Sequence, residues 1–203
     1  MSRLDKKRER IVTVLFMFAV TFVCTSGVCA AYLTTRDRIR INEELFFKKA
    51  VLSAAGMEIP ASGKEIDAVF ESLVQELENV CYAVTSDKDN SETCYVFVQS
   101  GAGLWGEIVA VIGLDKDLRC ITGIEFTKQN ETPGLGAKID ESDFRNKFKG
   151  KFGPFTMLPS GEAANENQFD AITGATITSS AVENILNQVV ERAGKMTKPE
   201  QQE

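Results

Sequence analysis

The stretch from Asp170 to Thr176, DAITGAT, combines hydroxyls, a glycine and an aspartate just ahead of a predicted helix. Thr173 and Thr176 stand on either side of the Gly174-Ala175 pair, and Asp170 precedes Thr173 by three residues. The N-terminus of a helix offers unpaired N–H groups and the positive end of the helix dipole, and both attract a phosphate group. We therefore interpret this stretch as a candidate phosphate site.

A capping motif explains part of this polarity without a ligand. Ser180 and Glu183 have the spacing of a capping box, in which two side chains satisfy N–H groups at a helix start. That motif accounts for neither Thr173 nor Thr176. A site for a free phosphate would also normally include a basic side chain, and the sequence has none between residues 151 and 192. Charge attraction alone is therefore a poor account of the stretch.

A second glycine-containing segment, ETPGLG, follows a predicted strand. Its residues are Glu131, Thr132, Pro133, Gly134, Leu135 and Gly136. Proline followed by glycine makes a loop that is first rigid and then flexible, and turn chemistry alone explains this composition. The segment is longer than a hairpin needs, however, and glycines let a backbone approach a flat ligand closely. We therefore interpret it as a candidate ligand-binding loop, with unpaired N–H groups near Gly134 and Gly136.

The stretch GAGLWG, residues 101–106, matches the GxGxxG pattern of dinucleotide-binding proteins. That pattern requires its glycines to lead from a strand into a helix, whereas the following residues, EIVAVIGLD, are typical of a strand. We therefore predict a glycine-rich hairpin corner instead of a dinucleotide site. Trp105 within it could belong to the core or form a stacking surface, and the sequence leaves both open.

The composition of the chain excludes several kinds of function. It contains no histidine, so a Ser-His-Asp triad and imidazole ligation of a metal are both impossible. Its five cysteines include no CxxC pair, and we predict neither a zinc site nor a disulfide framework. Beyond residue 10 the chain has 18 basic and 27 acidic residues, a net charge of −9, which argues against nucleic acid as a partner. We predict no catalytic residue and no metal ligand.

Residues 11–33 form an uncharged and almost wholly apolar run. At ~1.5 Å per residue, a helix of this length spans roughly 34 Å, enough for a hydrocarbon core of about 30 Å. A cleaved signal peptide is the alternative, because Val28-Cys29-Ala30 has the small residues of a cleavage site, although the usual apolar core of such a peptide has only about 7–15 residues. We predict a retained single-pass anchor in the cell membrane. The basic residues of the tail, residues 1–10, predict a cytoplasmic tail and an extracytoplasmic soluble domain.

The remaining chain has the periodicity of an α+β fold. Residues 34–60 are predicted as a helical connector, and apolar residues at helical spacing predict a helix over 64–80, opened by Ser62 and Glu65. Four β-branched and aromatic runs follow, at 81–86, 93–100, 106–115 and 120–128. Because the connections between them are short, we predict an antiparallel meander.

The C-terminal part of the domain is predicted to add a short helix at 141–150 and a strand at 151–158. A final helix should run from about Thr178 to Ala193 and end at Gly194. Its inward residues are predicted to be Ile177, Ala181, Val182, Ile185 and Val189. The predicted organisation is a tail (1–10), a membrane span (11–33), the connector (34–60) and one α+β domain with an antiparallel sheet (61–203).

The stretch from Asp170 to Thr176 resembles the D-x-x-[S/T]-G-A-T motif of the covalent FMN-binding domain family. The stretches GAGLWG and ETPGLGAK are similar to the two glycine-rich segments of that family, in the same order. The resemblance implies FMN as the cofactor, joined through its phosphate to Thr176 by a flavin transferase. It also implies that residues 173–175 form the attachment turn and that Trp105 and residues 131–136 flank the flavin.

With one predicted span and this length, the chain is similar to the family of G subunits of Rnf electron-transport complexes. That resemblance implies a membrane-anchored flavoprotein subunit, which relays electrons between reduced ferredoxin and NAD in a complex that moves Na+ or H+. Such a protein works with the other membrane and peripheral subunits and is not a stand-alone catalyst. The related family of C subunits of Na+-translocating NADH:quinone reductases shares the motifs and is an alternative. A flavin-free anchored sensor or interaction domain is a further one.

Overall fold

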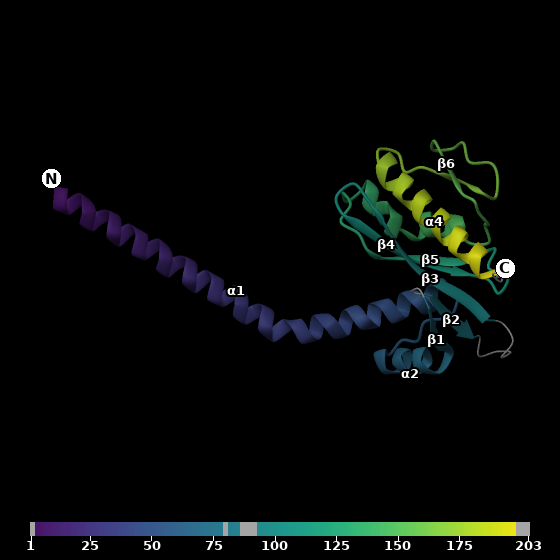
Figure 1. Ribbon diagram of the computed structural model, residues 1–203, viewed down its shortest axis with the longest axis horizontal. Coiled ribbons are helices and arrows are strands. Elements are labelled where there is room, and N and C mark those ends of the chain that lie inside the picture. Colours follow the sequence, from purple (N-terminus) through teal and green to yellow (C-terminus); the bar gives the residue numbers. More distant parts are fainter. Residues whose placement is uncertain (1–2, 79–80, 86–92, 198–203) are drawn as a thin grey trace, which may run out of the picture. The chain divides into compact units, whose positions relative to one another are not determined.

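The structure, a computed structural model, describes residues 3–78, 81–85 and 93–197 (Figure 1). The chain divides into two compact units, residues 1–44 and 45–203. Helix α1 runs from Arg3 to Ala54, so residues 45–54 of this helix belong to the second unit. The predicted span and the first part of the predicted connector are therefore continuous helix. The predicted division into tail, span, connector and domain stays a prediction.

The described part of the chain has one candidate membrane span, which lies within Lys7–Ala54 and qualifies by its length and composition. Large apolar side chains along it, among them Phe16, Phe18 and Phe22, are exposed to the surroundings. Such a helix, apolar on all sides and without a protein partner in its own unit, is expected where lipid surrounds it.

The second unit is built on a five-stranded antiparallel sheet with the strand order β1-β2-β3-β4-β5. The strands are β1 (Val74–Leu77), β2 (Cys81–Thr85), β3 (Thr93–Ala102), β4 (Glu107–Leu114) and β5 (Ile121–Lys128). Each strand pairs with its neighbour in sequence, so the predicted antiparallel meander and the α+β fold class are confirmed.

Both faces of the sheet are covered, which explains why its central strands are almost continuously apolar. One face packs against α4 (Thr176–Thr197), as Figure 1 shows. The core on this face includes Phe97 of β3 and Ile112 of β4. The opposite face packs against the end of α1, and its core includes Val96 and Val111. Helix α2 (Gly63–Leu73) adds Phe70 to this second core.

Two glycines make room for the end of α1 on the sheet. Gly113 and Gly123 are cross-strand partners on β4 and β5. A Cβ atom added to Gly113 would lie 2.1 Å from the carbonyl oxygen of Ala54, and one added to Gly123 would lie 2.9 Å from the same oxygen. The hydroxyl of Thr122 donates a hydrogen bond of 2.6 Å to that oxygen, so the last turn of α1 is held by a polar contact as well as by packing.

The segment after β5 is made of short elements. They are the 3-10 helix η1 (Gly136–Asp140), helix α3 (Ser142–Arg145), the 3-10 helix η2 (Asn146–Phe148) and the strands β6 (Thr156–Leu158) and β7 (Gln168–Asp170). β6 and β7 form a separate parallel pair. The predicted short helix at 141–150 is therefore split between α3 and η2, and the predicted strand at 151–158 is limited to its last three residues.

The predicted helix at 64–80 is wrong in its second half. Helix α2 ends at Leu73, and Val74–Leu77 forms the edge strand β1, while residues 79–80 lie outside the described residues. Helical periodicity did not reveal this change, because pairing with β2 decides the conformation of so short a segment. Ser62 does occupy the N-cap position of α2, but its side chain makes no capping hydrogen bond.

Helix α4 begins and ends beyond the predicted limits. It starts at Thr176, two residues early, and continues past Gly194 to Thr197. The capping box predicted for Ser180 and Glu183 is therefore wrong, because both residues lie inside the helix. The carboxylate of Glu183 instead accepts a hydrogen bond from the N–H group of Met157. Ala181, Val182, Ile185 and Val189 are buried as predicted, whereas Ile177 is 57% exposed and does not face the core.

Candidate functional site

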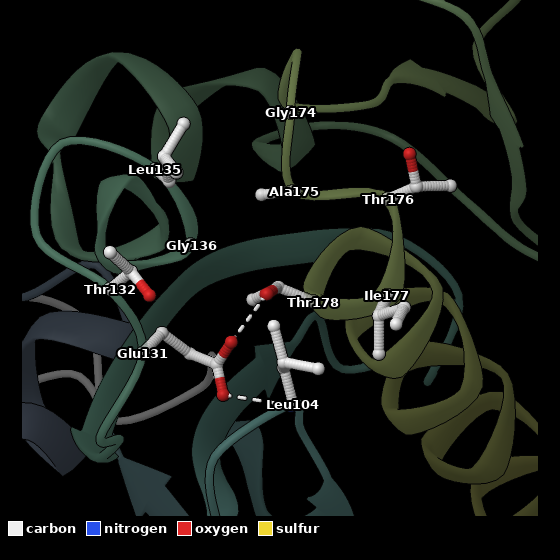
Figure 2. Close-up of a pocket in the computed structure, with 10 residues that line it drawn as sticks. All are labelled: Leu104, Glu131, Thr132, Leu135, Gly136, Gly174, Ala175, Thr176, Ile177 and Thr178. Atoms are coloured by element: carbon white, nitrogen blue, oxygen red, sulfur yellow. Dashed lines mark hydrogen bonds between the residues drawn. The ribbon is translucent and has the colours of Figure 1, made fainter.

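The three glycine-containing segments of the sequence come together around one pocket of about 300 Å³ (Figure 2). Leu104 comes from the loop between β3 and β4, and Ala175 from the turn before α4. The complete lining is Leu104, Glu131, Thr132, Leu135, Gly136, Gly174, Ala175, Thr176, Ile177 and Thr178. Ligand pockets typically measure about 300–1,000 Å³, so this one suits a small ligand or part of a larger one.

Thr176 is the first residue of α4, and its side chain is exposed. The turn ahead of it is closed by a hydrogen bond of 2.9 Å from the N–H group of Ala175 to the carbonyl oxygen of Ile172, and Gly174 within it has a φ of +81°. The buried hydroxyl of Ser179 accepts a hydrogen bond from the N–H group of Ile172 and donates one to the carbonyl oxygen of Ala175. The fold therefore presents the Thr176 hydroxyl from a fixed turn at a helix N-terminus.

Sequence reasoning missed Ser179 as a residue of this turn. It was visible only as one hydroxyl among several at the start of the helix. Its role depends on the turn folding back over the first turn of α4, and no local pattern indicates that arrangement.

Glu131 joins the three segments of the pocket. It is 5% exposed, and its Oε1 accepts hydrogen bonds from the N–H groups of Leu104 (2.9 Å) and Trp105 (3.1 Å). Its Oε2 accepts a hydrogen bond of 2.5 Å from the hydroxyl of Thr178 on α4 (Figure 2). One carboxylate thus connects the β3–β4 loop, its own loop and the first turn of α4.

Two glycines next to this carboxylate, Gly103 and Gly136, leave the space that the side chains of Glu131 and Thr178 occupy. A Cβ atom added to Gly103 would lie 2.5 Å from Oε1 of Glu131, and one added to Gly136 would lie 2.6 Å from the Thr178 hydroxyl. The sequence suggested that Gly136 lets a ligand approach the backbone. The structure places Glu131 and Thr178 against it, and Gly136 also lines the pocket, so its role beside a ligand stays a prediction. Gly134 has a φ of +75°, and this backbone turn accounts for glycine at that position.

Trp105 is 68% exposed and belongs to the rim of the site instead of the core. The N–H group of its indole donates a 3.1 Å hydrogen bond to the hydroxyl of Thr132. Trp105 lies in the corner between two paired strands, since β3 ends at Ala102 and β4 begins at Glu107. The predicted hairpin is therefore confirmed. Trp105 therefore does not belong to the core, and its role as a stacking surface stays a prediction.

Five of the predicted site residues do not line the pocket. They are Trp105, Asp170, Thr173, Pro133 and Gly134. Thr173 is exposed in the turn, and Pro133 and Gly134 are exposed at the tip of their loop. Their predicted roles as cofactor-binding residues, like those of the lining residues, stay predictions.

Asp170 closes the loop between β6 and β7. Its Oδ1 accepts hydrogen bonds from the N–H groups of Gly161 (2.8 Å), Ala163 (3.0 Å) and Glu162 (3.1 Å). The N–H group of Ala163, followed by those of the other two residues and the charge of Lys147, holds the pKa of the Asp170 carboxyl below its ordinary value. The aspartate of the DAITGAT stretch therefore positions the chain ahead of the turn, and its carboxylate is occupied.

Basic side chains are absent from the pocket lining. The described residues also contain no cluster of three or more carboxylates or cysteines that could hold a metal ion. The polar groups available to a ligand are hydroxyls, backbone groups and one carboxylate. A free phosphate would therefore find the helix N-terminus but no positively charged side chain among the lining residues.

Comparison with known proteins identifies the family. The family model of the FMN-binding domain matches residues 103–191, which include all three glycine-containing segments except the first two residues of GAGLWG. The chain is 31% identical over 181 residues to the G subunit of the ion-translocating oxidoreductase complex of Methanosarcina acetivorans, covering 85% of this chain and 90% of the relative. This chain belongs to the family of these G subunits.

A second member of the G-subunit family is similar along most of its length. The G subunit of the Na+-translocating ferredoxin:NAD+ oxidoreductase complex of Acetobacterium woodii is 28% identical over 184 residues, covering 88% of this chain and 87% of the relative. The fold is shared with C subunits of NADH-quinone reductases. The crystal structure of the C subunit of the Na+-translocating NADH-quinone reductase from Parabacteroides distasonis superposes with a TM-score of 0.68, at 25% identity, covering 81% of this chain and 98% of that chain.

The residues of the pocket fit FMN chemically. Leu104, Leu135 and Ile177 present partly exposed apolar side chains, which suit the faces of a flat aromatic ring system. Thr176 offers a hydroxyl at a helix N-terminus, where a phosphate group is favoured. The lack of a basic side chain in the lining fits a phosphate held by a bond to the chain better than one held by charge alone.

Proposed function

We propose that this chain is a membrane-anchored flavoprotein subunit, which carries FMN as a phosphoester on Thr176 and relays electrons within an ion-translocating oxidoreductase complex. The observation that carries this proposal is the convergence of three sequence segments on one pocket with the exposed Thr176 hydroxyl at its edge. When bound, FMN supplies the reversible uptake and release of electrons, and the protein supplies attachment, orientation and electrostatics.

Attachment at Thr176 makes chemical use of the helix start. The Thr176 oxygen forms a bond to the phosphorus of an activated flavin donor, a flavin nucleotide whose FMN phosphate is joined to a second phosphate by an anhydride bond. That anhydride bond breaks, the second phosphate leaves with the shared oxygen, and the hydroxyl proton is released. The ester phosphate keeps a negative charge beside the unpaired N–H groups of the first turn of α4, where the helix dipole stabilises an anion. Phosphate esters hydrolyse extremely slowly without a catalyst, so the link is permanent on the time scale of the protein. We infer that a flavin transferase makes this bond.

The anchor supports a location at the cell membrane with the flavin domain on the extracytoplasmic side. The tail ahead of the span carries five basic residues, Arg3, Lys6, Lys7, Arg8 and Arg10, and basic residues favour the cytoplasmic side. A permanent bond suits that location, because FMN released outside the cytoplasm would be lost. Residues 11–33 contain no ionisable Asp, Glu, Lys or Arg side chain, so we assign the ion path to partner subunits.

The reaction of the complex is inferred from its relatives. The name of the Acetobacterium woodii relative gives ferredoxin and NAD+ as its substrates and Na+ as its ion. We propose the same kind of complex, an Rnf-type ferredoxin:NAD oxidoreductase coupled to Na+ or H+, for this chain. The C subunit of a Na+-translocating NADH:quinone reductase is the second candidate, favoured by the structural similarity to the Parabacteroides distasonis protein. The subunits that co-purify with the chain distinguish the two complexes.

The attachment is tested by producing the full chain together with a flavin transferase and separating it on a denaturing gel. We expect a fluorescent band and an intact mass that includes one FMN group. Thr176→Val should lose both, because it removes the oxygen that forms the ester. Its stability should change by less than about 0.5 kcal/mol, since the side chain is exposed.

Ser180→Ala is the matched control. It also removes a hydroxyl from the start of α4, but Ser180 does not line the pocket. This variant should stay fluorescent. A fluorescent band in Thr176→Val, or a wild-type mass without FMN after production with the transferase, would contradict the proposed attachment. In the second case a flavin-free anchored domain becomes the better interpretation.

A further inference from the structure

Glu131 is a buried carboxylate with a hydrogen-bond arrangement that an uncharged side chain could reproduce. Both of its oxygens only accept, from two backbone N–H groups and one hydroxyl, which is the pattern of the ionised form. A glutamine could accept the same two N–H groups with its oxygen and donate its amide to the Thr178 hydroxyl oxygen. The three segments could therefore be joined without a charge.

Burying a charge is unfavourable, so the structure has to accommodate this one. Transfer of a carboxylate out of water requires compensating hydrogen bonds, and even satisfied buried charges are often no more stabilising than neutral groups. Two glycines, Gly103 and Gly136, leave the space that Glu131 and its partners occupy. Because the joining role needs no charge, the charge itself calls for a functional explanation.

The surroundings of Glu131 do not neutralise it. The lining of the pocket contains no lysine and no arginine, so no cation among these residues pairs with the carboxylate. Glu131 lies beside the positive N-terminal end of α4, because it accepts a hydrogen bond from the hydroxyl of Thr178 in the first turn of that helix. A helix terminus corresponds to only about half a unit charge, however, which is less than the full negative charge of a carboxylate. The floor of the pocket is thus electronegative.

We propose that Glu131 lowers the midpoint potential of FMN held in this pocket. When FMN in the pocket takes up an electron without a proton, it gains negative charge near the carboxylate of Glu131. Water screens the interaction between these two charges only a little, because the carboxylate is buried. Repulsion between the two makes reduction less favourable, and charge near a flavin is one of the means by which a protein sets its potential. This inference rests on the proposed function, namely that FMN occupies the pocket.

The test is a potentiometric titration of the purified, flavin-bearing full chain in detergent, with electrons supplied by dithionite through mediators and the flavin absorbance as the signal. In Glu131→Gln we expect the midpoint potential to rise by about 59 mV or more, a tenfold change in the equilibrium constant for a one-electron step. Glu141→Gln is the matched control: it removes an exposed carboxylate outside the pocket, and its potential should equal that of the wild type.

A second variant separates charge from geometry. Thr178→Val keeps the carboxylate but removes the hydroxyl that offsets part of its charge, so its midpoint potential should fall. If the potential depended only on the integrity of the pocket, both variants would shift it in the same direction, and that outcome would overturn the proposal. An unchanged potential in Glu131→Gln would also overturn it.

Folding and flavin content are checked before the potentials are compared. If Glu131→Gln loses its cooperative thermal transition, Thr178→Val alone decides: a fall supports the proposal, and an unchanged or higher value overturns it. If the wild-type chain carries no FMN by mass, the proposed function has failed, and this is seen before any potential is measured. The two failures are thereby distinguished.

Discussion

At the scale of single residues, the glycines and acidic residues of the motifs have different roles from those that their types suggest. Gly136 is next to a buried carboxylate and a threonine hydroxyl, so its missing side chain accommodates the protein itself. Glu131 is predicted as a residue that flanks a ligand, and the structure adds that it joins three segments of the chain. A short polar motif can thus combine positions that line a pocket with positions that shape it.

Asp170 is a second motif residue that shapes the chain near the pocket and does not line the pocket itself. Its predicted place beside the cofactor follows from its position three residues before Thr173, but its carboxylate accepts three N–H groups of the preceding loop. The loop and the carboxylate are separated by up to nine residues, and the sequence does not indicate that they meet. Asp170 therefore contributes to the stability of the β6–β7 region, which leads into the attachment turn.

Asp170→Asn should lower the thermal unfolding temperature at pH 7. The pKa of Asp170 is lowered in the folded protein, whereas in the unfolded chain it has its ordinary value of about 3.9. Its stabilising contribution is therefore complete above that value and is lost as the pH falls through the lower pKa of the folded state. Unfolding temperatures of both proteins between pH 7 and pH 2 test this. The difference should shrink below about pH 4, and a difference that stays constant down to pH 2 would contradict the assignment.

At the scale of elements, α4 provides both the proposed attachment position and the main cover of one sheet face. Its start at Thr176 places that residue's side chain at the edge of the pocket, while Val182 and Ile185 lie in the core. Ile177 lines the pocket and is exposed. One helix thus connects the proposed cofactor position to the core of the domain.

The end of α1 is an equally integral element of the second unit. Val51, Leu52 and Ala54 are completely buried, although the sequence suggested a connector outside the domain. The apolar residues of this segment were visible in the sequence. Their partners on the sheet were not, because the contact between Thr122 and Ala54 joins residues 68 positions apart.

Leu52→Ala should destabilise the second unit by about 2–5 kcal/mol, because it removes a fully buried aliphatic side chain and leaves a cavity. Ile41→Ala is the control on the same helix: Ile41 is 52% exposed, and its loss should change the stability by less than about 0.5 kcal/mol. Urea unfolding of the full chain in detergent, followed by Trp105 fluorescence, measures both. Equal stability of the two variants would show that the end of α1 does not belong to the folded domain.

At the scale of the whole molecule, the chain joins an apolar anchor with a basic tail to an acidic domain. A net charge of −9 beyond residue 10 keeps the domain soluble and disfavours close contact with anionic lipid headgroups. In the proposed function, the single helix keeps the electron carrier near its partner subunits, and the ion path is assigned to those subunits.

The proposed orientation predicts the activity of fusion proteins. Alkaline phosphatase needs disulfide bonds, which form in oxidising compartments outside the cytoplasm. Fused after Glu203, it should therefore be active in bacterial cells, whereas a fusion after Arg10, ahead of the span, should be inactive. The reverse result would mean that the flavin domain is cytoplasmic. Equal amounts of the two fusion proteins, measured by immunoblot, are required for the comparison.

The sequence by itself determined the features that depend on local patterns. The apolar run of residues 11–33, four of the five strands of the meander and the order of the glycine-containing segments are all visible as periodicity, composition or spacing. Each reflects a preference of a few neighbouring residues, such as alternation along a strand or the length of an apolar helix. The prediction of Thr176 as the attachment residue is of the same local kind, since its motif lies within seven residues, and it stays a prediction.

The tertiary structure alone decided what joins those segments. Glu131 and Thr178 meet across 47 residues, and Glu131 and Leu104 across 27. The change from helix to strand at Val74 depends on pairing with β2. The hydrogen bonds that the carboxylate of Asp170 accepts depend on a loop that folds back toward it. Contacts between distant segments form only when the whole domain folds around its core, so their energies are not contained in any local stretch of sequence.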